Sequence, residues 1–131
     1  MVRILIFGFW LGTVTQPIGA QKTELFDVFW KRFNQSLTHQ KSSIQFPLLV
    51  IHSPETTVDG KEKRFYMNAS DWKYINPTKG KEPKDTISIH RKSKDLYFVI
   101  LEHADTGIYI VYKFIQSKVG WRLVQINDES T

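Results

Sequence analysis

The sequence predicts an α+β fold, in which one N-terminal helix packs on a curved antiparallel sheet that ends in a three-stranded meander. Three observations lead to this prediction. Apolar residues recur at three- and four-residue steps between positions 25 and 37, which is the helical period. After Ser42 and Ser43 the pattern changes to β-branched and alternating runs. Three apolar runs joined by short turns then occupy positions 96–126. A helix and a sheet that each have one apolar face bury each other in two layers.

Residues 1–20 have the order of a secretory signal peptide. Arg3 precedes the short apolar run Ile4–Leu11, and Pro17 stands ahead of the small residue Ala20. This order predicts cleavage between Ala20 and Gln21. The apolar run is about half of the roughly 20 residues that a membrane-spanning helix needs, so we expect no permanent membrane span.

The predicted mature chain, residues 21–131, has the length of one α+β domain. It has no cysteine, so we expect neither disulfides nor the lipid anchor that a lipoprotein cysteine carries. Stability must then come from packing, for which the chain supplies many aromatic side chains. We therefore expect a periplasmic or secreted protein that is not tethered to a membrane.

The net charge of +5 is spread over short mixed segments of the chain. Basic residues gather at 61–64, 79–84 and 91–95, and acids interrupt or close each cluster. A nucleic-acid-binding protein typically presents its lysines and arginines on one face with exposed aromatic rings. The pattern favours solvated turns and predicts no nucleic-acid partner. A weak attraction to anionic sugars, lipids or cell-wall polymers stays open.

The first predicted element of the mature chain is a single amphipathic helix that begins after Thr23, its expected N-cap. Acidic residues come early in this segment and basic residues late, an order that complements the helix dipole. At about 100° per residue, one face of the helix carries six apolar side chains: Leu25, Phe26, Phe29, Trp30, Phe33 and Leu37. Such a stripe more often forms part of the core than of a ligand site, although it serves as both if the core is hollow.

The middle of the chain predicts short strands and turns. Ile44–Ile51 is apolar, but Pro47 cannot donate to a ladder, which favours an edge strand or the start of a strand. A hairpin is expected between Thr56–Val58 and Arg64–Met67, with its tight turn at Asp59 and Gly60.

A short helical turn and a loop are expected to follow this hairpin. Ser70 can cap a turn that carries Trp72 and Tyr74 inward. Asn76–Thr86 is rich in proline and lysine, which indicates an exposed loop.

The last third has the clearest β pattern. Turns at 105–107 and 118–120 separate its later strands, which should be consecutive antiparallel neighbours. The four predicted strands are Ile87–His90, Leu96–Leu101, Gly107–Ile115 and Trp121–Ile126. In the third of these, Ile108, Ile110, Tyr112 and Phe114 alternate with Tyr109, Val111, Lys113 and Ile115.

Three sequence pieces carry a family resemblance: IQFPL at Ile44–Leu48, ASDWK at Ala69–Lys73 and GWRLVQINDES at Gly120–Ser130. With the aromatic N-terminal helix they resemble a bacterial family of exported domains, catalogued as domain of unknown function 4348 and found mostly in Bacteroidetes. That family is similar to the nuclear transport factor 2-like superfamily. The resemblance implies a cone-shaped, cystatin-like fold with a pocket between helices and sheet. Members often carry a lipoprotein cysteine, which this chain lacks. The superfamily includes enzymes, binding proteins and scaffolds, so the fold names no activity.

No catalytic residue is predicted from the sequence. His39, His52, His90 and His103 lie apart from one another, which argues against a metal site, and no cofactor-binding motif is present. The cluster Glu102–Asp105 combines acids with an imidazole, but we expect it at a solvated hairpin tip. A cone-shaped isomerase or dehydratase needs an Asp, His or Tyr in a dry pocket. The candidates by residue type are Tyr66, Tyr97, Tyr109 and Tyr112.

Three hypotheses on function follow. The first is a noncatalytic binding domain, whose pocket for a small apolar or mixed ligand lies between the helix and the sheet. The expected pocket residues are Phe29, Phe33, Trp72, Tyr112 and Trp121. The second is an envelope interaction module, monomeric or homodimeric, that pairs through its outer sheet face or an edge. The third is a small isomerase, dehydratase or hydrolase, which requires a buried polar residue with a perturbed pKa.

Overall fold

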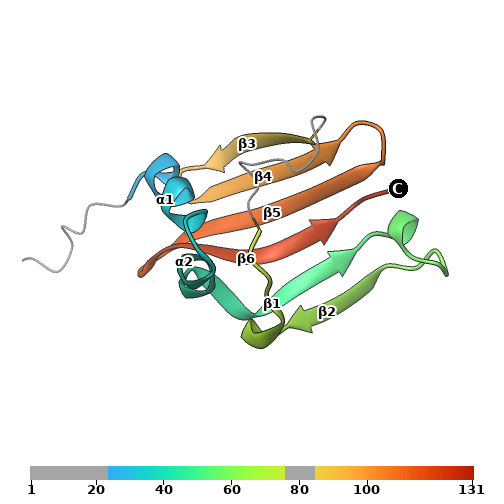
Figure 1. Ribbon diagram of the computed structural model, residues 1–131, viewed down its shortest axis with the longest axis horizontal. Coiled ribbons are helices and arrows are strands. Elements are labelled where there is room, and N and C mark those ends of the chain that lie inside the picture. The colour runs from blue at the N-terminus through green and yellow to red at the C-terminus, as the bar shows by residue number, and fades with distance from the viewer. Residues whose placement is uncertain (1–23, 76–84) are drawn as a thin grey trace, which may run out of the picture.

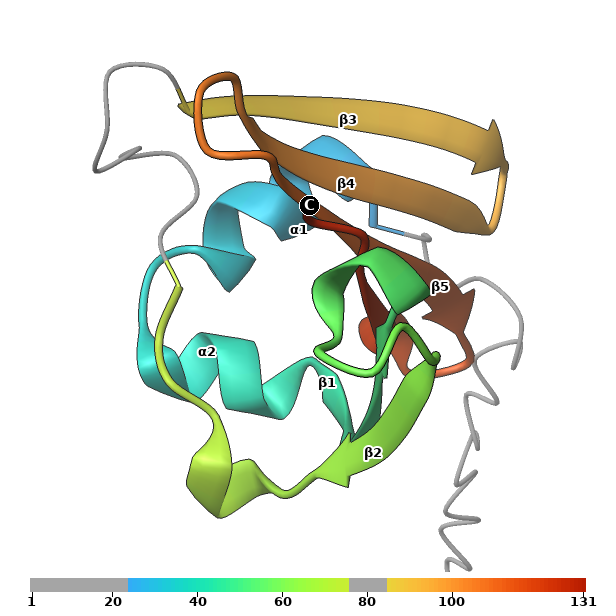
Figure 2. The ribbon, with the colours of Figure 1, turned by 90° about the vertical axis from the view of Figure 1, so that its right-hand side faces the viewer.

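A computed structural model describes residues 24–75 and 85–131 of the chain. The predicted signal peptide, the cleavage point at Ala20 and Gln21, and the Thr23 cap lie outside these residues, as does most of the predicted loop Asn76–Thr86. The described chain has the predicted two layers. Two short helices lie on one face of a curved six-stranded sheet (Figures 1 and 2).

The helical layer consists of α1 (Phe26–Phe33) and α2 (Leu37–Ser42), so the prediction of a single helix is wrong. Asn34 ends α1, and its Nδ2 donates to the Trp30 carbonyl at 2.8 Å. Ser36 caps the start of α2, and its Oγ accepts from the backbone N–H of His39 at 3.1 Å. Short polar side chains of this kind compete with the helical hydrogen-bond pattern, which explains the break.

The break also changes which side chains are buried. Phe26, Phe29, Trp30 and Phe33 face the sheet as predicted. Leu25 precedes the first turn of α1 and is 73% exposed, contrary to the prediction. Leu37 starts the second helix and is 39% exposed, because the stripe of α1 does not continue into α2.

The sheet has the strand order β2-β1-β6-β5-β4-β3. The predicted meander of the last three strands is confirmed, and β3 extends it by a further antiparallel pair. The strands are β1 (Ile44–His52), β2 (Lys63–Met67), β3 (Asp85–Ser93), β4 (Leu96–His103), β5 (Ile108–Ser117) and β6 (Gly120–Asp128). Asp85 and Thr86, expected in the loop, therefore belong to β3.

Strand β1 lies inside the sheet, so its prediction as an edge strand is wrong. It pairs antiparallel with β2 and parallel with β6, which makes the sheet mixed where an antiparallel one was expected. The pairing with β6 shifts register between Ile44 and Leu49, the segment that contains Pro47. A bulge is where an interior strand tolerates a residue without an N–H.

The predicted hairpin of Thr56–Val58 with Arg64–Met67 is also wrong, because β2 pairs with β1. Pro54–Thr56 forms a 3₁₀ turn, and Val58 is exposed beside it. Gly60 does adopt the positive φ of 69° that the Asp-Gly pair indicates.

After β2 the chain passes α2 and binds the side chain of Gln40 there. The predicted turn is a 3₁₀ turn at Ala69–Asp71, although Asn68 rather than Ser70 precedes it. Gln40 is completely buried, and its Oε1 accepts from Trp72 Nε1 and from the Ile75 N–H, both at 3.1 Å. Trp72 is buried as predicted, whereas Tyr74 is 40% exposed and only its hydroxyl reaches inward, donating to the Asn34 carbonyl at 2.5 Å.

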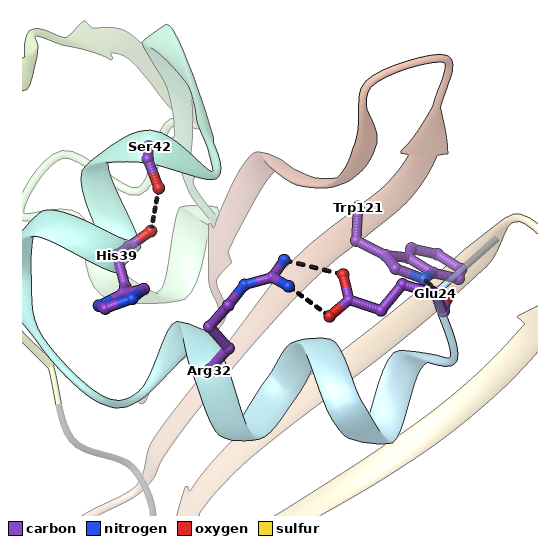
Figure 3. A network of polar contacts seen from close by, with 5 residues as sticks. All are labelled: Glu24, Arg32, His39, Ser42 and Trp121. Atoms are coloured by element: carbon purple, nitrogen blue, oxygen red, sulfur yellow. Dashed lines mark hydrogen bonds and ion pairs between the residues drawn. The ribbon is translucent and has the colours of Figure 1, made fainter. Parts of the chain in front are cut away.

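The core is an aromatic cluster between α1 and the sheet. Phe26, Phe29, Trp30 and Phe33 all contact Phe114 of β5, with ring centroids 5.3 to 5.8 Å away. Figure 3 shows the outer rim of this cluster, where Arg32 binds the Glu24 carboxylate through both terminal nitrogens. The Glu24 carbonyl accepts from Trp121 Nε1 at 2.8 Å, which ties the start of α1 to β6.

Candidate functional site

The inner face of the sheet, which faces the helices, has two unlike ends. Figure 1 shows α1 and α2 over the left-hand end, where the aromatic cluster lies, and we call this the covered end. Beyond the pair Phe114 and Leu123, the partners Tyr112 and Ile126 form one rung of the ladder, and Ile110 and Asp128 form the next. Direct cross-strand partners share a face, so these side chains continue the inner face beyond the cluster. We call this part the open end.

Tyr112 stands at the border between the two ends. Its side chain is buried, at 7% exposure, as the alternation along β5 predicts. Burial raises the pKa of the Tyr112 hydroxyl to about 12, and the negative charge of Asp128 adds to this effect. The phenol therefore keeps its proton at neutral pH and can donate it in a hydrogen bond.

Asp128 and His52 form the polar part of the open end next to Tyr112. They are direct partners in the parallel ladder of β1 and β6, and His52 Nδ1 lies 3.4 Å from Asp128 Oδ2. The other carboxylate oxygen accepts from the Ser130 N–H at 3.0 Å, which orients the group. The ring of His52 stacks on Phe65 of β2 with centroids 5.4 Å apart.

A second His/Asp pair lies on the far side of the open end. Asp85 and His103 are partners between β3 and β4, and His103 Nε2 lies 3.9 Å from Asp85 Oδ1. Thr106 Oγ1 is 2.9 Å from the other ring nitrogen. The expectation of a solvated hairpin tip is wrong for His103, because β4 extends through it and leaves the side chain 9% exposed. Its neighbour Glu102 alternates to the outer face.

This arrangement supplies one phenol donor, two carboxylates and two imidazoles beside apolar side chains. Such groups can bind alcohols, carbonyls or amines, and they are the residue types used in proton transfer. Within residues 24–75 and 85–131, no group of three or more His, Cys, Asp or Glu side chains is placed to hold a metal ion.

The five predicted pocket residues are all buried, and they come from different parts of the fold. Phe29, Phe33 and Trp121 belong to the covered end, where the rings of α1 pack against rings of the sheet. Trp72 lies beside Phe46 and binds Gln40. Only Tyr112 reaches the open end. The pocket between helix and sheet stays a prediction.

Sequence reasoning missed Asp128, His52 and Asp85 as site residues. Each is at or next to the end of a strand, and each meets its partner only through strand pairing. His52 and Asp128 come together through a parallel pairing that no local pattern indicates. The alternation of β5 was the available signal, since it places Tyr112 and Ile110 on one face.

The outer face of the sheet offers a different surface. A groove of about 390 Å³ crosses it, with Phe98, Ile100 and Val111 among its apolar residues. Lys92 and Lys113 contribute positive charge to the same groove. The interaction hypothesis would use this face, and it stays a prediction.

The fold has solved counterparts. It is similar to an NTF2-like protein from Bacteroides fragilis, with a TM-score of 0.64 and 17% identity over 88% of this chain and 51% of that one. A cystatin-like protein from Bacteroides caccae has a TM-score of 0.59 and 22% identity, covering 82% of this chain and 78% of that one. A protein from Bacteroides uniformis has a TM-score of 0.55 and 15% identity, covering 80% of this chain and 76% of that one.

These similarities establish the fold class. The chain has the α+β fold of NTF2-like and cystatin-like proteins, as the sequence predicts. It spans about half the length of the Bacteroides fragilis protein. No protein-family model matches the sequence, and no curated protein matches it either. In the described ranges, no helix combines the length and apolar character needed to cross a membrane.

Proposed function

We propose that this protein is a noncatalytic domain that binds a small ligand of mixed polarity at the open end of its inner sheet face. We also propose that residues 1–20 are a signal peptide, that the domain acts in the periplasm or after secretion, and that it belongs to the family of domain of unknown function 4348. The order of charge, apolar run and Pro17 supports export. The three sequence pieces named above support the family.

The observation that carries the proposal is the polar set of Tyr112, Asp128 and His52 beside apolar side chains of the same face. Placing polar groups there costs stability unless partners satisfy them. Ile108 and Phe65, on the same face, are 38% and 42% exposed. A ligand with an apolar body and one polar group satisfies both features, since its body covers these side chains and its polar group meets the phenol and the carboxylate.

The test is an NMR titration of the protein with a library of small molecules of mixed polarity. Binding should shift the amide signals of Ile110, Tyr112 and Asp128. Tyr112→Phe removes only the hydroxyl and should weaken binding about tenfold. Tyr109→Phe is the matched control, because Tyr109 lies on the same strand but lines the outer groove. Ligands that shift only outer-face signals would contradict the proposal.

A second candidate is an acid–base enzyme, which the raised pKa of Tyr112 favours. In this role Asp128 would accept a proton from the substrate, and Tyr112 would donate a hydrogen bond to the oxygen on which charge develops. Isomerases and dehydratases use such steps. The protein should then convert a ligand found in the screen, and Asp128→Asn should abolish turnover while binding persists. Recovery of every ligand unchanged rules this candidate out.

A further inference from the structure

The two His/Asp pairs of the open end imply a particular ligand shape. His52 and Asp128 lie on β1 and β6, while His103 and Asp85 lie on β4 and β3. Strand β5 runs between these pairs and contributes Ile108 and Ile110. The open end therefore has a carboxylate on each side and an apolar middle.

Charge adds to this geometry. Among the described residues, neither Asp85 nor Asp128 forms an ion pair with a lysine or arginine. Lys63, the ladder partner of His52 on β2, pairs with Asp59, and the adjacent Arg64 pairs with Glu62. Since no lysine or arginine among the described residues pairs with either carboxylate, each side of the open end attracts a cation.

The apolar middle is built from side chains that the core only partly covers. Ile87, Leu101 and Ile110 pack against the core from three neighbouring strands, and each keeps part of its surface accessible. Ile108 extends the same surface. An alkyl chain lying across them removes apolar area from water on both partners.

We propose that the open end binds an elongated molecule with an amine at each end and an apolar middle, one ammonium at Asp128 and the other at Asp85. This inference rests on the proposed function and names its ligand class. Three strand spacings of about 4.8 Å and an offset of one rung separate the two carboxylates, which is roughly 15 Å along the sheet. After about 3 Å is subtracted from this separation for each contact between an ammonium and a carboxylate, the remaining distance fits a diamine with an alkyl chain of medium length.

The experiment is a titration of the protein at pH 8 with 1,4-diaminobutane, 1,8-diaminooctane, 1,12-diaminododecane and octylamine. The medium diamine should bind most tightly, because its second ammonium binds intramolecularly once the first is in place. We expect its Kd to be about tenfold lower than that of octylamine. Equal affinities for octylamine and the diamine would overturn the inference.

Variants and the mapping of shifted NMR signals test the two sides of the open end separately. Asp85→Asn and Asp128→Asn should each raise the Kd of 1,8-diaminooctane to that of octylamine. Glu102→Gln, next to His103 but on the outer face, should leave the Kd unchanged. In the unaltered protein, the diamine should shift the amide signals of His103 and Asp128 together, which tests the inference even if a variant does not fold. A shift of only one of these two signals would overturn the inference.

The outcomes also distinguish this inference from the function on which it rests. If mixed-polarity ligands shift the signals of Tyr112 but diamines bind no better than octylamine, only the two-ended ligand is wrong. If neither the library nor the amines shift the NMR signals of the open end, the proposed binding function fails as well.

Discussion

The covered and open ends of the inner face use the same strands for different purposes. At the covered end, Phe114 and Leu123 are completely buried and the rings of α1 pack directly on the sheet. At the open end, Ile108 and Phe65 remain over one third exposed beside two His/Asp pairs. Dry aromatic packing stabilises a domain, whereas exposed apolar surface with polar groups contributes little to folding. The difference assigns stability to the covered end and leaves the open end as the place for the proposed ligand recognition.

The largest expected effect follows from removing a ring at the covered end. Phe114→Ala should lower the free energy of unfolding by about 3–5 kcal/mol, because it leaves a cavity under four aromatic neighbours of α1. Urea denaturation followed by tryptophan fluorescence measures this loss.

Phe65→Ala is the matched control at the open end. It removes the same ring from the same face, but from a side chain that is 42% exposed. We expect a loss of about 1 kcal/mol. Equal losses for the two variants would show that the ends do not differ in packing, and the comparison would be wrong.

A smaller effect is expected at alkaline pH, at the border between the ends. The pKa of Tyr112 is raised from 10.0 to about 12 in the folded protein. The unfolded chain therefore loses this proton first, so the contribution is fully present below pH 10 and is lost as the pH rises toward 12. At about 1.4 kcal/mol for each pH unit of difference, the loss amounts to roughly 2–3 kcal/mol.

The measurement is urea denaturation at pH 9, 10 and 11 on the unaltered protein and on Tyr112→Phe. Subtracting the free energies of unfolding of the variant from those of the unaltered protein isolates the contribution of Tyr112 from that of the other tyrosines. The difference should shrink by more than 1 kcal/mol between pH 9 and 11. A constant difference would place Tyr112 in contact with water and would remove it from the border of the buried cluster.

Local patterns predicted the covered end well and the open end poorly. The spacing of Phe26, Phe29, Trp30 and Phe33 indicates a buried helix face, and burial at that face follows from the spacing alone. The turns and alternation of the last third likewise predict the meander, since neighbouring strands pair through short connections.

The errors in the sheet and in the site share one physical cause, which is long-range pairing. Pro47 indicates an edge strand locally, yet β1 lies in the interior because its apolar residues pair with both β2 and β6. The same parallel pairing brings His52 to Asp128. Asp85 and His103 meet because β3 and β4 are longer than their apolar cores. Tertiary contacts decide these positions, so the site depends on information that the local sequence does not contain.

The smallest expected effect concerns the rim of the covered end, shown in Figure 3. Arg32 and Glu24 form a two-pronged ion pair, but their side chains are 46% and 23% exposed. Water and salt screen such a pair, so Arg32→Gln should lower the free energy of unfolding by about 0.2–1 kcal/mol, and less at high salt. The Trp121 hydrogen bond to the Glu24 main chain remains in this variant. Arg64→Gln removes a more exposed pair and should have a smaller effect still. A loss above about 2 kcal/mol for Arg32→Gln would show that the rim, and not the aromatic packing beneath it, holds α1 on the sheet.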